Sequence, residues 1–412
     1  MTTRWVRYPA LLWFALTAAI AFGADPVERL QQRLDAGEVQ LEYDAQWGYL
    51  PALLRAFDIS VASQTLVFSK TSAQFRLISS DSPRALYFND DVYVGFVRGG
   101  PFLEISAADP EGGGVFYALD QTERKSPRFS RDNGQCLQCH ESGRTQRVPG
   151  HITRSVYPDA EGQPFFGAGS TNVDHTTPIE ERFGGWYVTG TLADSSHRGN
   201  AVVNDPSAIE EFEAGPGSQL TRLDELIDTS AYLTPHSDMA AHLILAHQTQ
   251  MHNYIAKAGI EARNALKYGR EMERVFGEVS TDLKASVKRR IEGPSEKLLR
   301  HLLFVDEARL TGEVRGTSTF AQEFPLEGPH DAKGRSLRDL DLTRRIFRYP
   351  CSFLIYSEAF ASLPAEVKSF VFARLAEVLE GRDTSGVFDH LSESDRTAIR
   401  EILLETLAGF RS

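Results

Sequence analysis

Residues 84–119 read "RALYFNDDVYVGFVRGGPFLEISAADPEGGGVFYAL", and this stretch decides much of the fold. Short runs of β-branched and aromatic residues alternate in it with turn residues such as "NDD", "RGGP" and "DPEGGG". Runs of this length and composition are typical of strands joined by tight turns. Two similar runs come just before it, "QTLVF" (residues 64–68) and "AQFRLI" (73–78). The chain from Gln64 to Leu119 therefore predicts a set of hairpins or a small antiparallel sheet.

The chain after this stretch divides at about residue 204. Three more short strands are predicted between long loops: "ITRSVYP" (152–158), "PFFGAGS" (164–170) and "GGWYVTGTLA" (184–193). The composition changes at "NDPSAIEEFEAGPGS" (204–218), which is typical of a boundary. Beyond it the apolar residues recur at helical spacing. We therefore predict an α+β protein with a strand-rich N-terminal half and an all-helical C-terminal half.

Several helices of the C-terminal half can be bounded from the sequence. Residues 235–276 form a long helical pattern in which Ser237 is a candidate cap. Residues 282–307 predict one or two helices, interrupted at "EGP" (292–294). The pair Ser336 and Asp339 resembles a capping box, and it predicts a helix that ends before Pro350. Two more helices are expected, over 364–381 and 392–409.

The N-terminus has the features of a secretory signal peptide. Arg4 and Arg7 precede an uncharged, mostly apolar run from Tyr8 to Gly23 that is short for a membrane span. Small residues before Ala24 predict cleavage near Gly23. The predicted division is therefore a signal peptide at 1–23, a β-rich domain at 24–204 and a helical domain at 205–412. The expected location is periplasmic or otherwise exported, whereas an uncleaved segment would anchor the protein to the membrane.

Composition narrows the range of partners. The formal net charge is −12, and removal of the two arginines of the signal peptide would make it more negative still. An acidic surface repels phosphate backbones, so we expect no nucleic acid partner. No later stretch is apolar enough and long enough to suggest an integral membrane span after signal cleavage.

The segment "RDNGQCLQCHESGR" (131–144) carries the chemistry-bearing motif. It holds two of the three cysteines of the chain, Cys136 and Cys139, and His140 follows directly. Cys-x-x-Cys-His is the attachment sequence of haem c. Residues three apart on a helical turn face the same way, so two thiols can reach the two vinyl groups of one porphyrin. His140 is then placed under the iron as its axial ligand.

Three other interpretations of this motif remain. A redox-active disulfide would be expected beside a strand–helix pattern, and the flanking sequence is loop-rich instead. Half of a zinc site would need further ligands, and no second cysteine pair exists. A chance match of five residues is the third alternative. The third cysteine, Cys351, lies in the apolar run "YPCSFLIYS" and is expected to be a buried, inert side chain.

The motif resembles that of the c-type cytochromes, residue by residue: Cys136 and Cys139 as attachment sites and His140 as iron ligand. Runs such as "SVYPDAEGQP", "DHTTPIEERFGGWYVTG" and "AHQTQMHN" look like those of exported bacterial cytochrome-type proteins without an assigned function. The resemblance implies one covalently bound haem c, with its iron as the metal, and it implies no particular reaction. No second motif of this kind occurs, so a mono-haem protein is expected.

A second iron ligand is expected from the helix over 235–276. His247 and Met251 lie one turn apart on its predicted buried stripe and are the candidates. His252 is turned from His247 by about 140 degrees, so the two do not easily serve one iron. Three histidines in loops are rival ligands, although His175 is expected to make turn hydrogen bonds: His151, His175 and His197. Three others are expected at the surface or in caps: His301, His330 and His390.

The expected function is one-electron transfer through the haem, with a redox partner protein of unknown identity. The alternative is a haem enzyme, in which an open sixth iron position supports peroxidase-like or oxidase-like chemistry. The size of the chain favours an enzyme, because hundreds of residues lie beyond the motif. No signature of a specific reaction accompanies it. Arginines beside the motif are candidate partners for haem propionates: Arg131, Arg144, Arg147 and Arg154.

Overall fold

A seven-stranded sheet forms the centre of the N-terminal half, in the order β6-β5-β4-β3-β2-β1-β9. The computed structural model describes residues 23–193, 195–205, 209, 217–277 and 281–411. Every neighbouring pair in this sheet is antiparallel. The sheet strands are β1 (Thr65–Val67), β2 (Arg84–Phe88), β3 (Val92–Phe96), β4 (Phe102–Asp109), β5 (Gly113–Asp120), β6 (Phe129–Arg131) and β9 (Trp186–Tyr187). The predicted hairpins are therefore confirmed as consecutive strands of one sheet.

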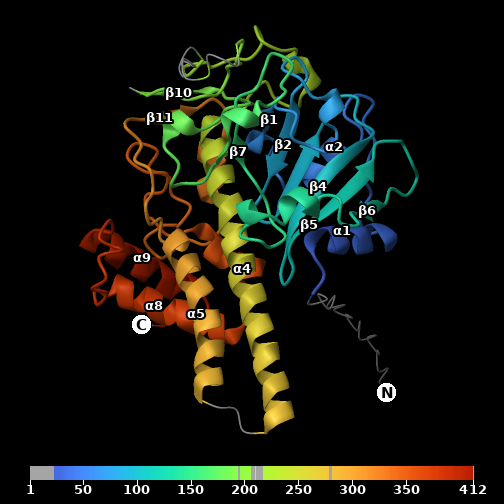
Figure 1. Cartoon of the computed structure of the whole chain (residues 1–412). Coiled ribbons are helices and arrows are strands. Elements are labelled where there is room, and N and C mark those ends of the chain that lie inside the picture. The colour runs from blue at the N-terminus through green and yellow to red at the C-terminus, as the bar shows by residue number, and fades with distance from the viewer. Residues whose placement is uncertain (1–22, 194, 206–208, 210–216, 278–280, 412) are drawn as a thin grey trace, which may run out of the picture.

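One face of the sheet is covered by two helices of the N-terminal half. These are α1 (Pro26–Asp35) and α2 (Leu50–Ala56), and their apolar side chains join those of β2 to β5 in one buried cluster (Figure 1). Shorter elements follow the sheet: α3 (Leu137–His140), β7 (Arg154–Ser155), β8 (Thr171–Asn172) and β10 (Gly190–Leu192). Two predicted strands are wrong. The segments 73–78 and 164–170 contain single 3₁₀ turns instead, Phe75–Leu77 and Phe166–Ala168.

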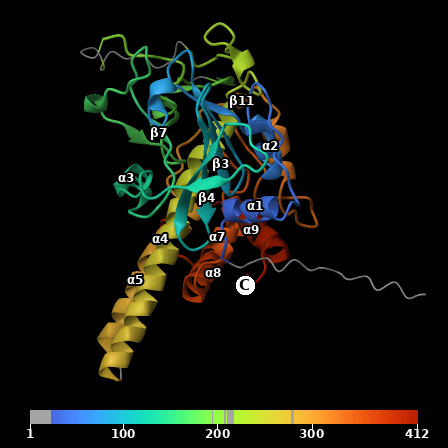
Figure 2. The same ribbon diagram turned by 90° about the vertical axis from the view of Figure 1, so that its right-hand side faces the viewer.

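The C-terminal half is helical. Its elements are α4 (Met239–Phe276), α5 (Thr281–Leu302), β11 (Val314–Gly316), α6 (Phe320–Glu323), α7 (Glu358–Ala361), α8 (Ala365–Leu379) and α9 (Glu393–Thr406). In Figures 1 and 2, α4 and α5 lie side by side and extend beyond the rest of the chain. No helix in the described ranges combines the length and apolarity needed to cross a membrane. Strand β11 pairs with β10, so the prediction of an all-helical half is wrong in this detail.

Two helix predictions need correction. Helix α5 runs without interruption through Pro294, where a break was expected. The hydroxyl of Ser295, the residue after this proline, donates to the carbonyl of Ile291 at 2.7 Å. No helix forms over 336–349. Ser336 and Asp339 make local turn contacts, and the backbone N–H of Ser336 donates to the Asp339 carboxylate at 3.2 Å.

The carboxylate of Asp238 begins helix α4. Its Oδ1 atom accepts from the backbone N–H groups of Ala240 (2.8 Å) and Ala241 (3.2 Å). Its Oδ2 atom accepts from the backbone N–H groups of Thr317 and Ser318, each at 2.8 Å, just after β11. Asp238, not the expected Ser237, is thus the N-cap, and the same side chain fastens the loop after β11.

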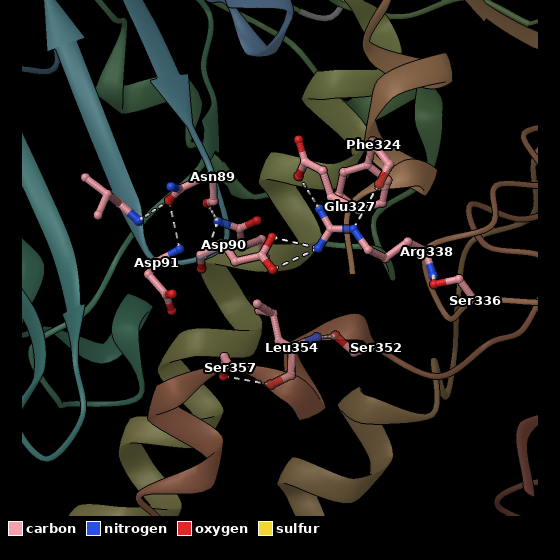
Figure 3. Close-up of polar contacts among 12 residues, drawn as sticks. Asn89, Asp90, Asp91, Phe324, Glu327, Ser336, Arg338, Ser352, Leu354 and Ser357 are labelled. Carbon is pink, nitrogen blue, oxygen red and sulfur yellow. Dashed lines mark hydrogen bonds and ion pairs between the residues drawn. The ribbon is translucent and has the colours of Figure 1, made fainter. Parts of the chain in front are cut away.

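Arg338 joins the two halves at a second place (Figure 3). Its guanidinium pairs with Asp90 at 2.8 Å, in the turn between β2 and β3, and with Glu327 at 2.9 Å. The side chain is 4 % exposed and lies over the rings of Phe324 and Phe353, at 4.0 and 4.7 Å from their centroids. One large apolar cluster also contains residues of both halves. The halves therefore share a core as well as ion pairs.

Candidate functional site

The cysteine–histidine motif forms a single helical turn. Cys136 stands at the N-cap of α3, and its carbonyl accepts from the backbone N–H groups of Cys139 (3.1 Å) and His140 (3.0 Å). Asp132 stabilises the start of this turn, because its carboxylate accepts from the backbone N–H of Cys136 at 3.1 Å. Two thiols and one imidazole are thereby placed on the same short segment, as the sequence predicted.

Both thiols are free, with Cys136 half-buried and Cys139 exposed. Burial, followed by the charge and hydrogen bond of Asp132, raises the pKa of Cys136 to about 11. This thiol is therefore protonated at neutral pH. Thiol–disulfide exchange requires a thiolate, so the site is poorly suited to the redox-disulfide alternative. Burial keeps Cys351, the third cysteine, protonated as well, which agrees with the expected inert role.

The imidazole of His140 has a defined orientation. Its Nδ1 atom lies 2.9 Å from the carbonyl oxygen of Gly150, which can only accept, so Nδ1 carries the proton. The ring also packs on Phe116 of β5, with 4.7 Å between the centroids. Burial lowers the pKa of His140, which keeps the ring neutral. The Nε2 atom therefore keeps its lone pair, and this is the form in which histidine binds a metal ion.

Helix α4 holds the segment that orients His140. The side chain of Asn253 accepts from the backbone N–H of His151 at 2.9 Å and donates to the carbonyl of the same residue at 2.8 Å. Gly150 lies directly before this clamp, and a Cβ atom on it would stand 2.1 Å from the Asn253 Oδ1 atom. The C-terminal half thus positions the histidine of the motif through Asn253.

We expect Gly150→Ala to disturb His140 specifically. The added methyl forces the segment away from Asn253, at a cost of about 1–3 kcal/mol for overpacking, and weakens the hydrogen bond to His140. The measurement is the free energy of unfolding, together with the NMR titration of His140. Gly143→Ala is the matched control, since nothing lies within 4 Å of its added Cβ atom. Equal effects of the two substitutions would contradict this account.

The two residues predicted as the second iron ligand, His247 and Met251, make other contacts in the structure. His247 bonds to His175 and Ser352, and Met251 is fully buried in the apolar cluster. His252 has a different partner from His247: its Nδ1 atom lies 3.1 Å from the Tyr93 hydroxyl. The assignment of His247 or Met251 to the iron stays a prediction. Of the rival ligands, His151 is nearest to the motif, because both it and His140 pack on Phe116.

His151 and His252 form a buried pair, with 5.8 Å between their ring centroids. Both ring nitrogens of His151 and the Nε2 atom of His252 are buried without a hydrogen-bond partner. They line a small cavity of about 10 Å³ together with Asn253 and Gly150. Burial lowers the pKa of both rings, to about 4 for His252. The space admits a water molecule at most.

A second group of histidines was not predicted from the sequence. His175, His247 and His301 each offer a ring nitrogen, and these atoms lie within 4.8 Å of one another. His301 is 5 % exposed, so its expected place at the surface is wrong. His175, a rival ligand that was expected to make turn hydrogen bonds, has its Nδ1 atom 2.9 Å from Nδ1 of His247. The three residues come from three distant segments, and no spacing in the sequence relates them.

Comparison with known proteins gives no relative for this chain: no family model, no curated protein and no solved structure matches it. This result overturns the resemblance to the c-type cytochromes and to the exported bacterial cytochrome-type proteins. The motif of Cys136, Cys139 and His140 covers too little of the chain to carry a family assignment without such a match. The assignment is therefore wrong, and what the motif can do has to be argued from its own geometry.

Proposed function

We propose that this chain carries one haem, bound covalently through Cys136 and Cys139, and passes single electrons through it. The observation that carries the proposal is the hydrogen bond from His140 Nδ1 to the Gly150 carbonyl. It leaves the Nε2 lone pair of His140 free on the same turn that bears two free thiols. This geometry suits an axial iron ligand beside two attachment points. The proposal rests on these residues and on no family.

Covalent attachment requires reduced thiols, and Cys136 and Cys139 are both free. In forming a thioether, the S–H bond adds across a vinyl C=C bond, so that sulfur bonds to one carbon and the hydrogen goes to the other. No oxidant or reductant is consumed. The raised pKa of Cys136 keeps its proton available for this addition. When bound, the iron porphyrin supplies the one-electron chemistry.

The exposure of the turn favours electron transfer over the enzyme alternative. Cys139 is exposed. Three cavities in the described part of the chain, of about 10, 20 and 300 Å³, are not lined by Cys136, Cys139 or His140. A group attached here would keep an edge toward solvent, where a redox partner can reach it. Near Cys139, Arg154 is half-buried and its Nε atom has no partner, which suits a propionate contact.

Covalent attachment is tested by expression with a working haem-attachment system in a periplasm, followed by denaturation and digestion. We expect haem to remain on the peptide that contains Cys136 and Cys139. The Cys136→Ala/Cys139→Ala variant should lose all covalent haem, whereas the matched Cys351→Ala variant should keep it. Haem that separates on denaturation of the unmutated chain would overturn the proposal. Carbon monoxide binding then distinguishes an enzyme-like open iron position from a six-coordinate carrier.

Export is part of the same proposal. The predicted signal peptide, residues 1–23, lies almost wholly outside the described residues, so its support is the sequence alone. Fractionation of the expressing cells is the direct measurement. We expect the mature chain in the periplasmic fraction with its N-terminus near Ala24.

A further inference from the structure

We propose that His175, His247 and His301 bind one transition-metal ion, of the zinc class, at a site separate from the cysteine–histidine motif. Their ring nitrogens lie within 4.8 Å of one another. Zn–N bonds of about 2.0–2.1 Å place tetrahedral ligand atoms roughly 3.4 Å apart. Small rotations of buried rings close the difference. Imidazole groups are preferred ligands of zinc, copper, iron and nickel.

Three segments of the chain deliver the three rings. His247 stands in the middle of α4, His301 near the end of α5, and His175 in the turn after β8. The rings of His247 and His301 are stacked, with 5.3 Å between centroids and 8° between planes. His175 approaches His301 to 4.2 Å between centroids. An ion between them would fasten the N-terminal half to both long helices.

The strongest argument is the set of polar atoms without partners. The Nε2 atoms of His175 and His301 are buried and accept or donate no hydrogen bond. His175 is 0 % and His301 5 % exposed, so water is not their partner at the surface. Buried polar atoms are nearly always satisfied in folded proteins. A metal ion satisfies these nitrogens at once.

His247 has the neighbours of a metal ligand. Its Nε2 atom lies 2.8 Å from the hydroxyl of Ser352, whose oxygen can accept a hydrogen bond from a protonated Nε2. This leaves the Nδ1 lone pair of His247 facing His175, whose Nδ1 atom lies 2.9 Å away. Metal-binding histidines typically donate their second ring nitrogen in this way. Figure 3 shows Ser352 beside Leu354, whose backbone N–H also donates to that hydroxyl, at 3.4 Å.

The surroundings keep the ligands neutral and enclosed. Burial lowers the pKa of each of the three histidines, to about 4 for His301. Phe304 stacks on His247 at 4.3 Å, and Tyr254 lies 4.7 Å from His301. These rings exclude solvent from two sides. A closed site of this kind favours a structural ion over an exchangeable one.

One buried guanidinium and two carboxyl groups lie near the three histidines. The fully buried guanidinium of Arg182 donates to the carbonyl of His175 at 3.1 Å and would repel a cation. Asp174 acts in the opposite sense on both Arg182 and His301. Glu307 is a second carboxyl group near Arg182. Asp174 is next to His175 in the chain, so it is the carboxylate placed to compensate the ion.

The test uses the full chain with Cys136→Ala/Cys139→Ala, so that neither haem nor thiols contribute. Chelator-treated protein is dialysed against Zn²⁺, and bound zinc is counted by elemental analysis. We expect one zinc per chain. His301→Gln should weaken binding at least about 100-fold. The matched control is His242→Gln, which removes another buried histidine of α4, one that bonds to Ser237 and Tyr187 instead.

Either of two results would overturn the proposal: no zinc bound by the parent chain, or unchanged zinc in a folded His301→Gln variant. Should that variant fail to fold, X-ray absorption at the zinc edge of the parent chain decides. Three imidazole donors support the site, and any smaller number refutes it. Because Cys136 and Cys139 are absent from the tested chain, failure here leaves the haem proposal untouched. Loss of haem in the unmutated chain likewise leaves this site untouched.

Discussion

Acidification from pH 7 to pH 5 is expected to remove most of the free energy of unfolding of this protein. The cause is a set of seven buried histidines: His151, His175, His197, His242, His247, His252 and His301. Burial lowers the pKa of each, to about 4 for His197, His252 and His301. In the unfolded chain the same side chains titrate near their ordinary value of about 6.5.

The direction of the effect follows from proton uptake. Below about pH 6.5 the histidines of the unfolded chain bind protons, whereas the buried rings of the native state stay neutral until the pH approaches 4. The free energy of unfolding therefore falls as the pH is lowered from about 6.5 to 4. Each histidine with a native pKa near 4 lowers the free energy of unfolding by about 2 kcal/mol at pH 5, relative to neutral pH. The three groups with a native pKa of about 4, His197, His252 and His301, together lower it by about 6 kcal/mol. This is comparable to the roughly 5–15 kcal/mol that stabilises a typical domain, and the other four histidines act in the same direction. Asp91 and Glu307 oppose the effect, because burial raises the pKa of each to about 7.

The measurement is denaturant unfolding between pH 5 and 7 in the presence of a chelator. Removing one buried histidine with His242→Gln should reduce the slope by about one proton, or about 1.4 kcal/mol per pH unit. Exposed His330 supplies the control, since His330→Gln should leave the slope unchanged. A free energy of unfolding that does not vary over this range would show that the buried rings are charged or solvated.

Asp238→Ala is expected to destabilise the protein by about 5 kcal/mol. The carboxylate is fully buried and accepts four backbone N–H groups, at the start of α4 and after β11. Loss of an N-cap costs about 1 kcal/mol. Each buried donor left without a partner adds about 1–3 kcal/mol.

Asp238→Asn separates capping from the second contact. The amide oxygen can still cap α4, but its NH₂ group then faces the N–H groups of Thr317 and Ser318. We expect an intermediate loss of stability, measured by denaturant unfolding. Ser392→Ala removes the exposed capping box of α9 and should cost only about 1 kcal/mol. A loss that small for Asp238→Ala would refute the proposed junction.

Local patterns predicted the sheet and the longest helices well, and failed where distant contacts decide. The strands over 84–119 follow from alternating apolar residues and turns. The spacing of Ser336 and Asp339 predicted a capping box. The carboxylate of Asp341 instead forms a turn a few residues later, because it accepts from the backbone N–H groups of Thr343 and Arg344. The buried guanidinium of Arg338 keeps this segment against the core instead. No property of residues 336–349 alone reveals these partners.

The candidate site divides in the same way. Cys136, Cys139 and His140 are neighbours in sequence, so the turn that unites them could be predicted. The helical stripe that pointed to His247 and Met251 assumed one buried face, yet almost every residue from Met239 to Asn253 is buried. A helix enclosed on all sides gives no periodic signal of which neighbour each side chain meets. His175 and His301 reach His247 only through the tertiary fold.

Helix α4 carries His247 and, six residues later, Asn253, about 9 Å apart along one rigid axis. Both neighbourhoods therefore belong to a single cooperative unit of native-state opening. Hydrogen exchange of the amide protons from residue 247 to residue 253 should report one common free energy of opening. Binding that stabilises α4 at either of these two neighbourhoods should therefore reduce local opening at the other.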